Sequence, residues 1–468
     1  MQYHSTRGTA PHLGFEEVLL TGLARDGGLY LPADWPGLSA ASWRALAAAD
    51  YCSLAAAMLR PFIDAAPLRE ALPELLGEAY AGFAHRAVAP LVQVAPDLWL
   101  LELFHGPTLA FKDVAMQLLG RLFERVLAAR GQRLTILGAT SGDTGSAAIE
   151  ALRGSAAVEV FILHPKGRTS EVQRRQMTTV LDDNIHNIAV EGSFDDCQDL
   201  VKALFNDHAF RDRYRLSAVN SINWGRILAQ SVYYAYAALA LGAPAREIGF
   251  VVPTGNFGNA FAGYVAQRMG LPMGKLTVAA NANDILPRFL DSGTMSLGGV
   301  APTLSPSMDI QVSSNFERLL YEVLGRDGGR VTAFLTAFRR EGSVRLGEPE
   351  LAAIRARFAG GRLDDAGTLE EIGRTYGETG LLIDPHTAVG LAVARRRVAA
   401  GAGPTVVLST AHPAKFPDAV ERATGCRPAL PPRLADLYER PERLAALAND
   451  AEALKALMAV RLGTAVAA

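Results

Sequence analysis

The sequence has few cysteines and almost no net charge. Its 468 residues include three cysteines, Cys52, Cys197 and Cys426, which are scattered without metal-site spacing. This argues against a disulfide framework and a structural zinc site, and it is typical of a reducing compartment, so we expect the cytoplasm. Lys plus Arg (46) nearly balance Asp plus Glu (48), which leaves a formal charge of -2. No overall field therefore attracts nucleic acid or an anionic membrane, and any anionic ligand must be recognised locally.

The sequence also lacks a long uninterrupted apolar run. The N-terminal stretch MQYHSTRGTAPHLGF has no apolar core of the kind found in a signal peptide. The most apolar long segment, Ile227–Ala243, is interrupted by Gln230, Ser231 and three tyrosines. We therefore predict a buried helix there and no membrane span. There is no internal repeat, and no low-complexity tract is long enough to suggest disorder.

The chain is long enough for about two to four domains. Residues 1–90 are rich in Ala and Leu, helical in pattern and punctuated by the turn RDGGLYLP (Arg25–Pro32), so we predict a mainly helical N-terminal domain. Strand-like and helix-like segments alternate over residues 91–430, although residues 290–370 are harder to interpret. We predict a catalytic domain there and a helical, Ala-rich tail over residues 431–468.

The alternation after residue 91 predicts an α/β fold with parallel strands. The expected strands are Leu98–Leu103, Leu134–Leu137, Val158–Leu163, Ile185–Val190, Ile248–Pro253 and Thr405–Thr410. The expected helices are Asp113–Arg130, one after Gly145, Thr169–Val180, Asp195–Asn206, the apolar segment already noted and one beginning near Asn259. Ligands of open α/β sheets bind at the carboxyl ends of strands, so the loops that follow the strands are the candidate sites.

The first candidate loop is GATSGDTGSAA, Gly138–Ala148, between a predicted strand and a predicted helix. Its small residues let the backbone approach a ligand, and free N–H groups at a helix start favour an anion. No Lys follows the glycines, so it is not a Walker A loop. An ordinary capped turn explains the same residues equally well.

The second candidate loop is PTGNFGNAFAG, Pro253–Gly263. Gly255 and Gly258 allow converging N–H groups, which suit a doubly charged phosphate. The loop lacks the G-x-G-x-x-G pattern, which makes a dinucleotide site a weak interpretation. The alternative is a tight turn that requires positive φ.

The third candidate loop is STAHPAKFP, Ser409–Pro417. Thr410 offers a hydroxyl, and His412 and Lys415 can contact an anion or each other. A surface turn with solvated charges is the alternative, and from this loop alone it is the better one.

One lysine, Lys112, stands among apolar neighbours in HGPTLAFKDVAMQ, just before a predicted helix. A cation at a helix N-terminus is opposed by the helix dipole. Partial burial beside Phe104, Leu109 and Phe111 would further lower the pKa of the ammonium, as a nucleophilic lysine requires. A lysine whose ammonium simply reaches into water is the alternative.

Nine motifs, spread in order from residue 5 to residue 417, resemble those of threonine synthases of the long bacterial and fungal type. They are STRG, GLARDGGLYLP, FHGPTLAFKD, GATSGDTGSAA, SINWGRILAQ, PTGNFGNAFAGY, NANDILPRFL, SSNFERLLYE and TAHPAKF. This family belongs to the tryptophan-synthase-β-like (fold type II) enzymes that use pyridoxal 5'-phosphate (PLP). The resemblance implies two α/β halves with the site between them.

The resemblance also implies roles for particular residues. Lys112 matches the lysine that binds the cofactor covalently, and Thr410 matches the hydroxyl that faces the pyridine nitrogen. The loop that holds the cofactor phosphate matches Gly255, Asn256, Phe257, Gly258 and Asn259. Many relatives have Asp where this chain has Asn259. The loop that binds the substrate carboxylate matches Thr140, Ser141, Gly142, Asp143 and Thr144.

The implied reaction converts O-phospho-L-homoserine and water to L-threonine and phosphate. Asn223, Arg226 and Lys415 are our candidates for binding the substrate phosphate, because Arg offers a planar fork and Lys a point charge. The alternatives are a helix-surface ion pair for Arg226 and a solvated loop for Lys415. His105 and His412 could steer a phosphate or a proton, but a histidine satisfied by backbone groups is commoner.

Two other functions stay open. One is another PLP-dependent lyase of this fold group, such as a serine or threonine dehydratase. The N-terminal motifs and the lack of an obvious appended regulatory domain argue against it. The other is a degenerate threonine-synthase-like protein that binds phosphorylated metabolites without turnover, against which Lys112 and both Gly-rich loops argue. We expect a small-molecule substrate, no nucleic-acid or membrane partner, and a monomer or homodimer.

Overall fold

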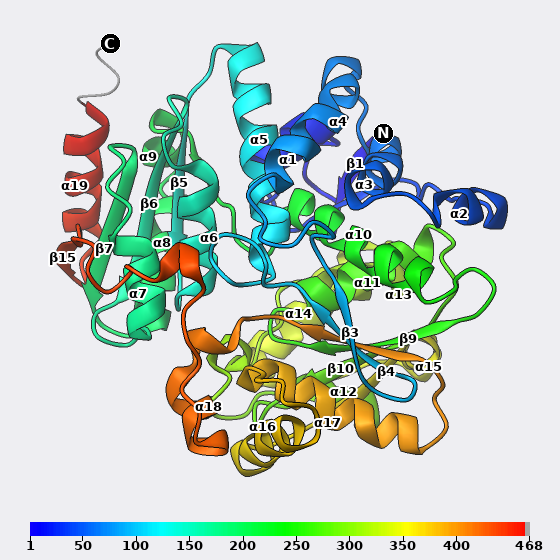
Figure 1. The fold of residues 1–468 in the computed structure, drawn as a ribbon. Coiled ribbons are helices and arrows are strands. Elements are labelled where there is room, and N and C mark those ends of the chain that lie inside the picture. Colours follow the sequence, from blue (N-terminus) through cyan, green and yellow to red (C-terminus); the bar gives the residue numbers. More distant parts are fainter. Residues whose placement is uncertain (464–468) are drawn as a thin grey trace. The chain divides into compact units, whose positions relative to one another are not determined.

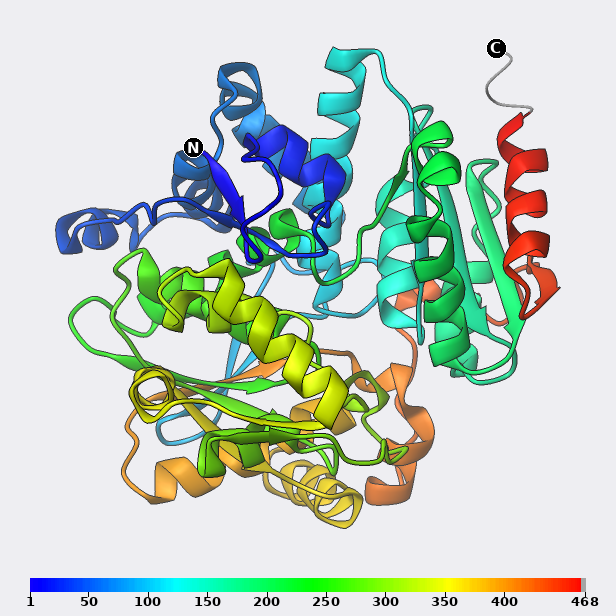
Figure 2. The ribbon, with the colours of Figure 1, turned by 180° about the vertical axis from the view of Figure 1, so that it is seen from behind.

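The computed structural model describes residues 1–463, which form two compact units (Figures 1 and 2). The first unit comprises residues 1–19, 23–115 and 221–429. The second comprises residues 20–22, 116–220 and the chain from residue 430 onward. Each unit is built around its own sheet, as an α/β fold with two halves requires.

The first unit contains a six-stranded sheet in the order β13-β10-β9-β14-β4-β3. The strands are β3 (Leu91–Ala95), β4 (Leu98–Glu102), β9 (Ile248–Pro253), β10 (Met273–Ala280), β13 (Phe358–Arg362) and β14 (Thr405–Ser409). All neighbours are parallel except β3 and β4. Val407 of β14 pairs with Leu100 of β4 and Val251 of β9, and all three are buried. The centre of this sheet is therefore fully apolar, as parallel strands covered on both faces require.

Helices cover this sheet and form the rest of the first unit. Helix α17 (Pro385–Ala399) packs on β14 and β9, and α16 (Asp365–Thr379) packs on α17. The other helices are α1 (Phe15–Thr21), whose last two residues belong to the second unit, α2 (Ala40–Leu46), α3 (Tyr51–Leu59), α4 (Ala66–Tyr80), α10 (Trp224–Ala240), α11 (Gly258–Arg268), α12 (Ile285–Ser292), α13 (Phe316–Val323), α14 (Gly328–Glu341), α15 (Glu348–Arg357) and α18 (Pro417–Thr424). Two small antiparallel sheets pair β1 (Tyr3–Ser5) with β2 (Tyr30–Pro32), and β11 (Thr294–Ser296) with β12 (Ser343–Arg345).

The second unit contains a five-stranded parallel sheet in the order β15-β7-β6-β5-β8. The strands are β5 (Leu134–Ala139), β6 (Val158–Pro165), β7 (Ile185–Glu191), β8 (Leu216–Ser217) and β15 (Ala445–Ala448). The helices are α5 (Lys112–Arg130), whose first residues belong to the first unit, α6 (Asp143–Leu152), α7 (Glu171–Thr178), α8 (Phe194–Asn206), α9 (His208–Arg213) and α19 (Ala451–Gly463). Phe161, Ile188, Cys197 and Met458 share one buried cluster, so α8 and α19 close this core.

The structure confirms the predicted α/β class and most of the predicted elements. Strand β9 has the predicted bounds, and α8 differs from its prediction by one residue at its start. The N-terminal region is mainly helical but also contains the β1–β2 pair. The predicted helical tail contains α19 and, in addition, residues 445–448, which form β15 beside β7. Residues 464–468 of this prediction lie outside the described residues. The domain bounds 1–90, 91–430 and 431–468 stay a prediction.

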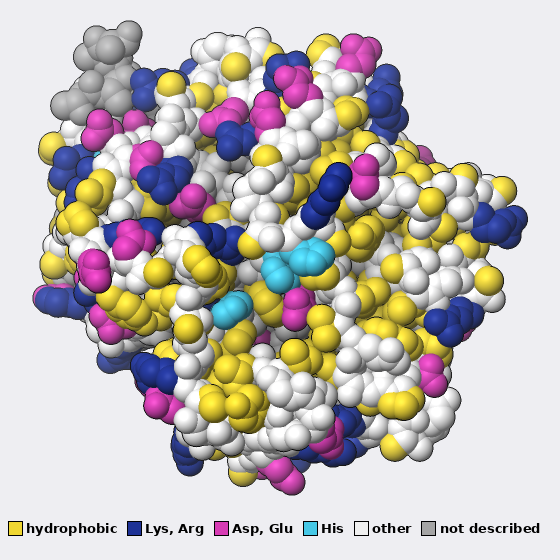
Figure 3. All heavy atoms as spheres, viewed as in Figure 1, with side chains coloured by type: hydrophobic (Ala, Val, Ile, Leu, Met, Phe, Trp, Pro, Cys, Tyr) yellow, Lys and Arg dark blue, Asp and Glu magenta, His cyan; other side chains and the backbone are white. Residues whose placement is uncertain are grey.

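Charged groups of both signs lie on the face of the molecule that Figure 3 shows. Figure 3 shows acidic and basic side chains interspersed over the visible face, as the near-zero net charge suggests. Within residues 1–463, no helix is long and apolar enough to span a membrane. The same residues contain no cluster of three or more His, Cys, Asp or Glu side chains that could hold a metal ion. Cys52, Cys197 and Cys426 are free thiols.

Candidate active site

Three strand ends of the first unit bring candidate residues to one edge of its sheet. Beyond β4, Leu103 donates from its backbone nitrogen to the carbonyl of Ser409 at 3.0 Å. Phe111, just before Lys112, donates likewise to the carbonyl of Thr410 at 2.9 Å. Strand β9 runs parallel to β14, so the loop Gly255–Asn259 begins at the same edge. Lys112, Thr410 and this loop are therefore gathered at the carboxyl ends of three adjacent strands, where α/β enzymes bind their ligands.

Lys112 is the first residue of α5 and is buried, with only 9% of its surface exposed. Its ammonium lies 5.1 Å from the centroid of the Phe111 ring. The alternative of a solvated surface lysine is therefore wrong. Leu109, three residues earlier, has a φ of +63°, a left-handed conformation that is rare for a bulky residue. Such strain persists only where the surrounding structure imposes it, and it is common near functional groups.

The loop before Lys112 is held by the buried carboxylate of Asp113. Its oxygens accept hydrogen bonds from the backbone nitrogen of Thr108 at 2.8 Å and from the Thr108 hydroxyl at 2.6 Å. Burial raises the pKa of Asp113 to about 6, although the Thr108 hydrogen bonds and the charge of Lys415 act in the opposite direction. A Cβ on Gly106 would lie 2.3 Å from the Cβ of Asp113, so only glycine fits against this carboxylate. Sequence reasoning did not single out Asp113.

Lys415 is fully buried, which contradicts the alternative of a solvated loop. Its ammonium donates to the carbonyl of Thr108 at 2.8 Å and therefore supports the same loop that precedes Lys112. The predicted contact of Lys415 with the substrate phosphate stays a prediction. The two nearby histidines have structural partners: His412 Nδ1 accepts from the backbone nitrogen of Ala414 at 3.1 Å, and His105 Nε2 lies 2.8 Å from Glu102 Oε2.

In the loop Gly255–Asn259, the carbonyl groups of the first two residues are hydrogen-bonded to residues outside the loop. The carbonyl of Gly255 accepts from the Ser313 hydroxyl at 2.7 Å, and that of Asn256 accepts from the backbone and side-chain nitrogens of Asn315, each at 3.1 Å. Because a trans peptide sets its N–H opposite its C=O, the N–H groups of Asn256 and Phe257 point away from those partners. Phe257 has a φ of +62° at the N-terminus of α11. This is the converging geometry expected of an anion cradle.

Asn259 follows in the first turn of α11. Its Oδ1 accepts from the hydroxyl of Tyr233 and, at 3.1 Å, from that of Tyr234. Its Nδ2 is buried and has no hydrogen-bond partner among the described residues. An unsatisfied buried donor costs about 1–3 kcal/mol, and an anionic oxygen would remove that cost. The residues at this sheet edge therefore fit a phosphorylated cofactor.

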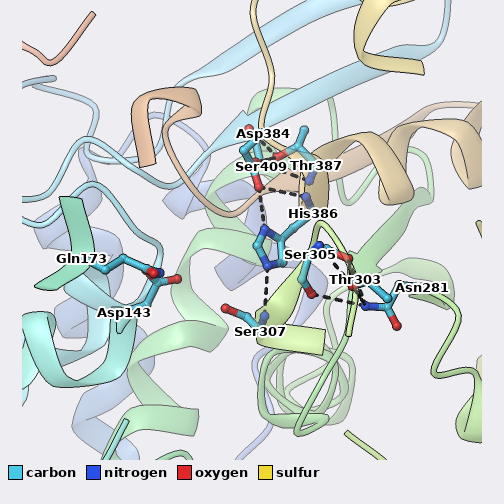
Figure 4. A network of polar contacts seen from close by, with 10 residues as sticks. All are labelled: Asp143, Gln173, Asn281, Thr303, Ser305, Ser307, Asp384, His386, Thr387 and Ser409. Carbon is cyan, nitrogen blue, oxygen red and sulfur yellow. Dashed lines mark hydrogen bonds and ion pairs between the residues drawn. The ribbon is translucent and has the colours of Figure 1, made fainter. Parts of the chain in front are cut away.

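A network missed by the sequence reasoning lies at the start of α17 (Figure 4). Asp384 caps the helix by accepting from the backbone nitrogens of His386 at 2.9 Å and Thr387 at 3.3 Å. The Thr387 hydroxyl lies 3.0 Å from that of Ser409, the residue before Thr410. The motif DPHT does show a helix cap with proline at the first position. The motif does not show what the imidazole of His386 contacts.

The TSGDT loop lies at the carboxyl end of β5 in the second unit. The Thr140 hydroxyl accepts from the backbone nitrogens of Gly142 and Gly145, each at 2.9 Å. Asp143 Oδ1 accepts from Gln173 Nε2 at 2.8 Å (Figure 4). Thr140, Gly142 and Asp143 are buried, whereas Ser141 and Thr144 are half-buried. The loop is a strand-to-helix turn held by these hydrogen bonds, and its binding of a carboxylate stays a prediction.

Asn223 and Arg226 lie at the start of α10 in the first unit, and both are buried. Asn223 caps the helix, since its Oδ1 accepts from the Gly225 nitrogen at 2.9 Å while its Nδ2 donates to the carbonyl of Leu19 at 2.9 Å. Burial lowers the pKa of Arg226 to about 10. The alternative of a surface ion pair for Arg226 is therefore wrong. A buried cation favours a nearby anion, but phosphate binding by these residues stays a prediction.

Comparison with known proteins shows the family of this chain. A family model described as pyridoxal-phosphate dependent enzyme matches residues 85–347. Models described as threonine synthase N terminus and threonine synthase, C-terminal match residues 2–80 and 387–458. A threonine synthase of Pseudomonas aeruginosa is 53% identical, over 98% of both chains. The chain belongs to the threonine synthase family.

Solved threonine synthases have the same fold. The PLP-bound enzyme from Brucella melitensis is 53% identical with a TM-score of 0.95, covering 98% of this chain and 99% of that one. The yeast enzyme is 40% identical with a TM-score of 0.93, covering 99% of each. These relatives confirm the α/β fold with two parallel sheets, the membership in the threonine synthase family and PLP as the cofactor.

Proposed function

We propose that this chain converts O-phospho-L-homoserine and water to L-threonine and phosphate, the last step of threonine biosynthesis. The observation that carries the proposal is the gathering of Lys112, Thr410 and the loop Gly255–Asn259 at one sheet edge, in a chain similar to threonine synthases along its whole length. A reactive amine, a ring partner and a phosphate cradle are what PLP chemistry requires of a protein.

The first unit would hold PLP at three points: Lys112 binds covalently, Thr410 faces the pyridine nitrogen and Gly255–Asn259 bind the phosphate. When bound, PLP supplies an electron sink that makes protons on the substrate carbons acidic. A hydroxyl partner such as Thr410 does not require a protonated pyridine nitrogen, so the electron sink would be weaker than with a protonated ring.

Lys112 would act as a base once the amine of the substrate has taken its place and freed its own amine. This amine would remove protons from Cα and then Cβ of the substrate, so that phosphate can leave from Cγ. The same amine would return one proton to Cγ, water added at Cβ would give the threonine hydroxyl, and a last proton would return to Cα, while the proton that water releases leaves with phosphate. One mobile amine among buried neighbours can serve all these transfers, because it is both strongly shielded from water and attached to a flexible chain.

Two sets of residues are proposed to bind the substrate. The backbone N–H groups and hydroxyls of Thr140–Thr144 would bind the carboxylate. Asn223, Arg226 and Lys415 would bind the phosphate that leaves. Their burial supports this role for the two cations, because a buried positive charge is stabilised by an anionic ligand.

The test is to purify the protein, record its visible spectrum, and measure phosphate and threonine formed from O-phospho-L-homoserine. We expect a cofactor band that borohydride removes, and equal amounts of the two products. Lys112→Ala should abolish turnover while the far-ultraviolet circular dichroism spectrum stays unchanged. Substantial activity in that variant would refute the role of Lys112.

The same preparation separates the two alternatives. A serine or threonine dehydratase would release a keto acid from serine or threonine and form no threonine from O-phospho-L-homoserine. A degenerate binding protein would bind PLP or phosphorylated ligands without forming either product. We expect neither result.

We also propose that the enzyme works in the cytoplasm as a monomer or homodimer. Free thiols throughout the described chain and a near-zero net charge support this setting. Light scattering of the purified chain would give one or two chains per particle, and a larger particle would contradict the proposal. Cell fractionation should recover threonine-forming activity in the cytoplasmic fraction.

A further inference from the structure

The imidazole of His386 connects the start of α17 to a turn beside the phosphate loop. His386 Nδ1 lies 2.8 Å from Asp384 Oδ1, and the backbone nitrogen of Ser307 donates to His386 Nε2 at 3.2 Å (Figure 4). Both Asp384 and His386 are buried, at 0% and 3% exposure. Nothing in the reaction described above uses either side chain.

The partners of the two ring nitrogens fix the tautomer of His386. A backbone N–H can only donate, so Nε2 must accept from Ser307 and cannot carry a hydrogen. The hydrogen of the neutral ring is then on Nδ1, where it is donated to Asp384. Asp384 itself is locked in place by the backbone nitrogens of His386 and Thr387 and by the Thr387 hydroxyl. The ring is therefore held rigidly as an acceptor directed at Ser307.

Ser307 lies directly against the phosphate loop. A Cβ built on Gly255 would lie 2.4 Å from the carbonyl oxygen of Ser307, so the two backbones are in close contact. The N–H of Ser307 donates to His386, and the carbonyl oxygen of Ser307 packs against Gly255. A shift of Ser307 would therefore move the boundary of the cradle.

The same helix start also reaches the strand that carries the ring partner. The Thr387 hydroxyl donates to Asp384. Its oxygen lies 3.0 Å from the hydroxyl oxygen of Ser409. Ser409 is the last residue of β14 and precedes Thr410. The start of α17 thus contacts residues next to two of the three proposed cofactor contacts, the loop Gly255–Asn259 and Thr410.

The turn that contains Ser307 has other support. Asn281 Nδ2 donates to the Thr303 hydroxyl at 2.8 Å, to the Ser305 hydroxyl at 3.0 Å and to Asp309 Oδ1 at 2.8 Å. These bonds anchor residues on either side of Ser307. Loss of the His386 acceptor should therefore leave the turn folded while it removes the hydrogen bond at the Ser307 nitrogen.

We infer that His386, fixed in one tautomer by Asp384, is a positioning residue that sets the phosphate cradle for PLP through the backbone of Ser307. The inference rests on the proposed function, because it places the cofactor phosphate in the loop Gly255–Asn259. His386 itself touches neither cofactor nor substrate in this scheme.

The test compares His386→Leu, which removes the acceptor, with His386→Gln, which keeps an acceptor at a similar distance from the backbone. The readouts are the dissociation constant of PLP, titrated into the full chain freed of cofactor, and the ³¹P resonance of the bound phosphate. We expect His386→Leu to raise the dissociation constant about tenfold and to shift or broaden the resonance. His386→Gln should stay within about threefold of the parent.

The matched control is His186→Leu in the second unit. His186 is also paired with a carboxylate, at 3.0 Å from Glu159 Oε2, and its ring stacks on Phe161. This variant should lower thermal stability while leaving the ³¹P resonance and PLP affinity unchanged. An equal loss of affinity in His186→Leu, or in His386→Gln and His386→Leu alike, would overturn the inference.

Two further measurements keep the result decisive. If His386→Leu does not fold, His386→Asn takes its place, because its amide can still reach Asp384 but has no atom at the Nε2 position. It should reproduce the expected loss of affinity, and unchanged affinity would refute the inference. Threonine formation by the parent protein is measured separately: its absence would refute the proposed function, whereas the PLP and ³¹P results alone decide the role of His386.

Discussion

Replacement of Asp113 by asparagine tests how the loop before Lys112 is stabilised. Burial raises the pKa of Asp113 from 3.8 to about 6, so the folded protein binds this proton more tightly than the unfolded chain does. The carboxyl group therefore contributes stability that is fully present below about pH 4 and is lost as the pH rises through about 6. At about 1.36 kcal/mol for each pKa unit, the full change amounts to roughly 3 kcal/mol.

The measurement is the free energy of unfolding of parent and Asp113→Asn in urea between pH 4.5 and 7.5. The other acidic groups titrate in both proteins, so the difference between the two isolates Asp113. We expect similar free energies of unfolding at pH 4.5, because the Asn amide, like the protonated Asp113 carboxyl, offers one donor and one acceptor to Thr108. Toward pH 7.5 the parent should lose about 2 kcal/mol relative to the variant, because only the parent loses the proton at this position.

Infrared spectroscopy provides an independent measurement of the same proton. In the difference spectrum between the parent and Asp113→Asn, a protonated carboxyl band should be present at pH 5 and absent at pH 7.5. A stability difference that does not change with pH, together with no such band at pH 5, would refute the assignment of a raised pKa to Asp113.

The remaining predictions concern the cofactor loop and the start of α10. Gly255→Ala should reduce PLP affinity by at least about a hundredfold, because its Cβ would lie 2.4 Å from the Ser307 carbonyl; unchanged affinity by titration would contradict this. Asn223→Ala should lower the free energy of unfolding by about 1 kcal/mol, because the helix cap is lost. A KM for O-phospho-L-homoserine more than about tenfold higher in this variant would show that Asn223 also contacts the substrate. Arg226→Met should raise that KM about tenfold or more, because the variant loses a buried cation proposed to bind the substrate phosphate; an unchanged KM would remove Arg226 from the phosphate site.

The sequence predicted the elements whose signals are local. Ile248–Pro253 is a run of apolar and β-branched residues between polar segments, and it forms the central strand β9 with the predicted bounds. The glycines of the following loop and the lysine before α5 also carry their signals within a few positions. Their gathering at one sheet edge follows from parallel strand order, which the alternating pattern indicates.

Contacts between distant segments could not be predicted in the same way. The bond between Ser307 and His386 joins residues 79 positions apart, and β15 pairs with a strand more than 200 positions earlier. Asn223 and Lys415 were assigned to ligand binding from their side-chain chemistry alone. The structure gives each a structural partner as well, because a polar side chain that becomes buried must satisfy its hydrogen bonds within the fold.

The three proposed cofactor contacts share a structural feature that explains the fully buried polar groups around them. Each is hydrogen-bonded to, or lies next to, a buried polar side chain. Asp113 accepts from the loop of Lys112, and Tyr234 donates to Asn259. The hydroxyl of Thr387 lies beside that of Ser409, the residue before Thr410. Buried polar groups that are fully hydrogen-bonded resist displacement, because moving any one of them leaves another unsatisfied. Apolar packing alone would allow small shifts at little cost. The polar support therefore fixes positions to the accuracy that the proposed cofactor contacts require.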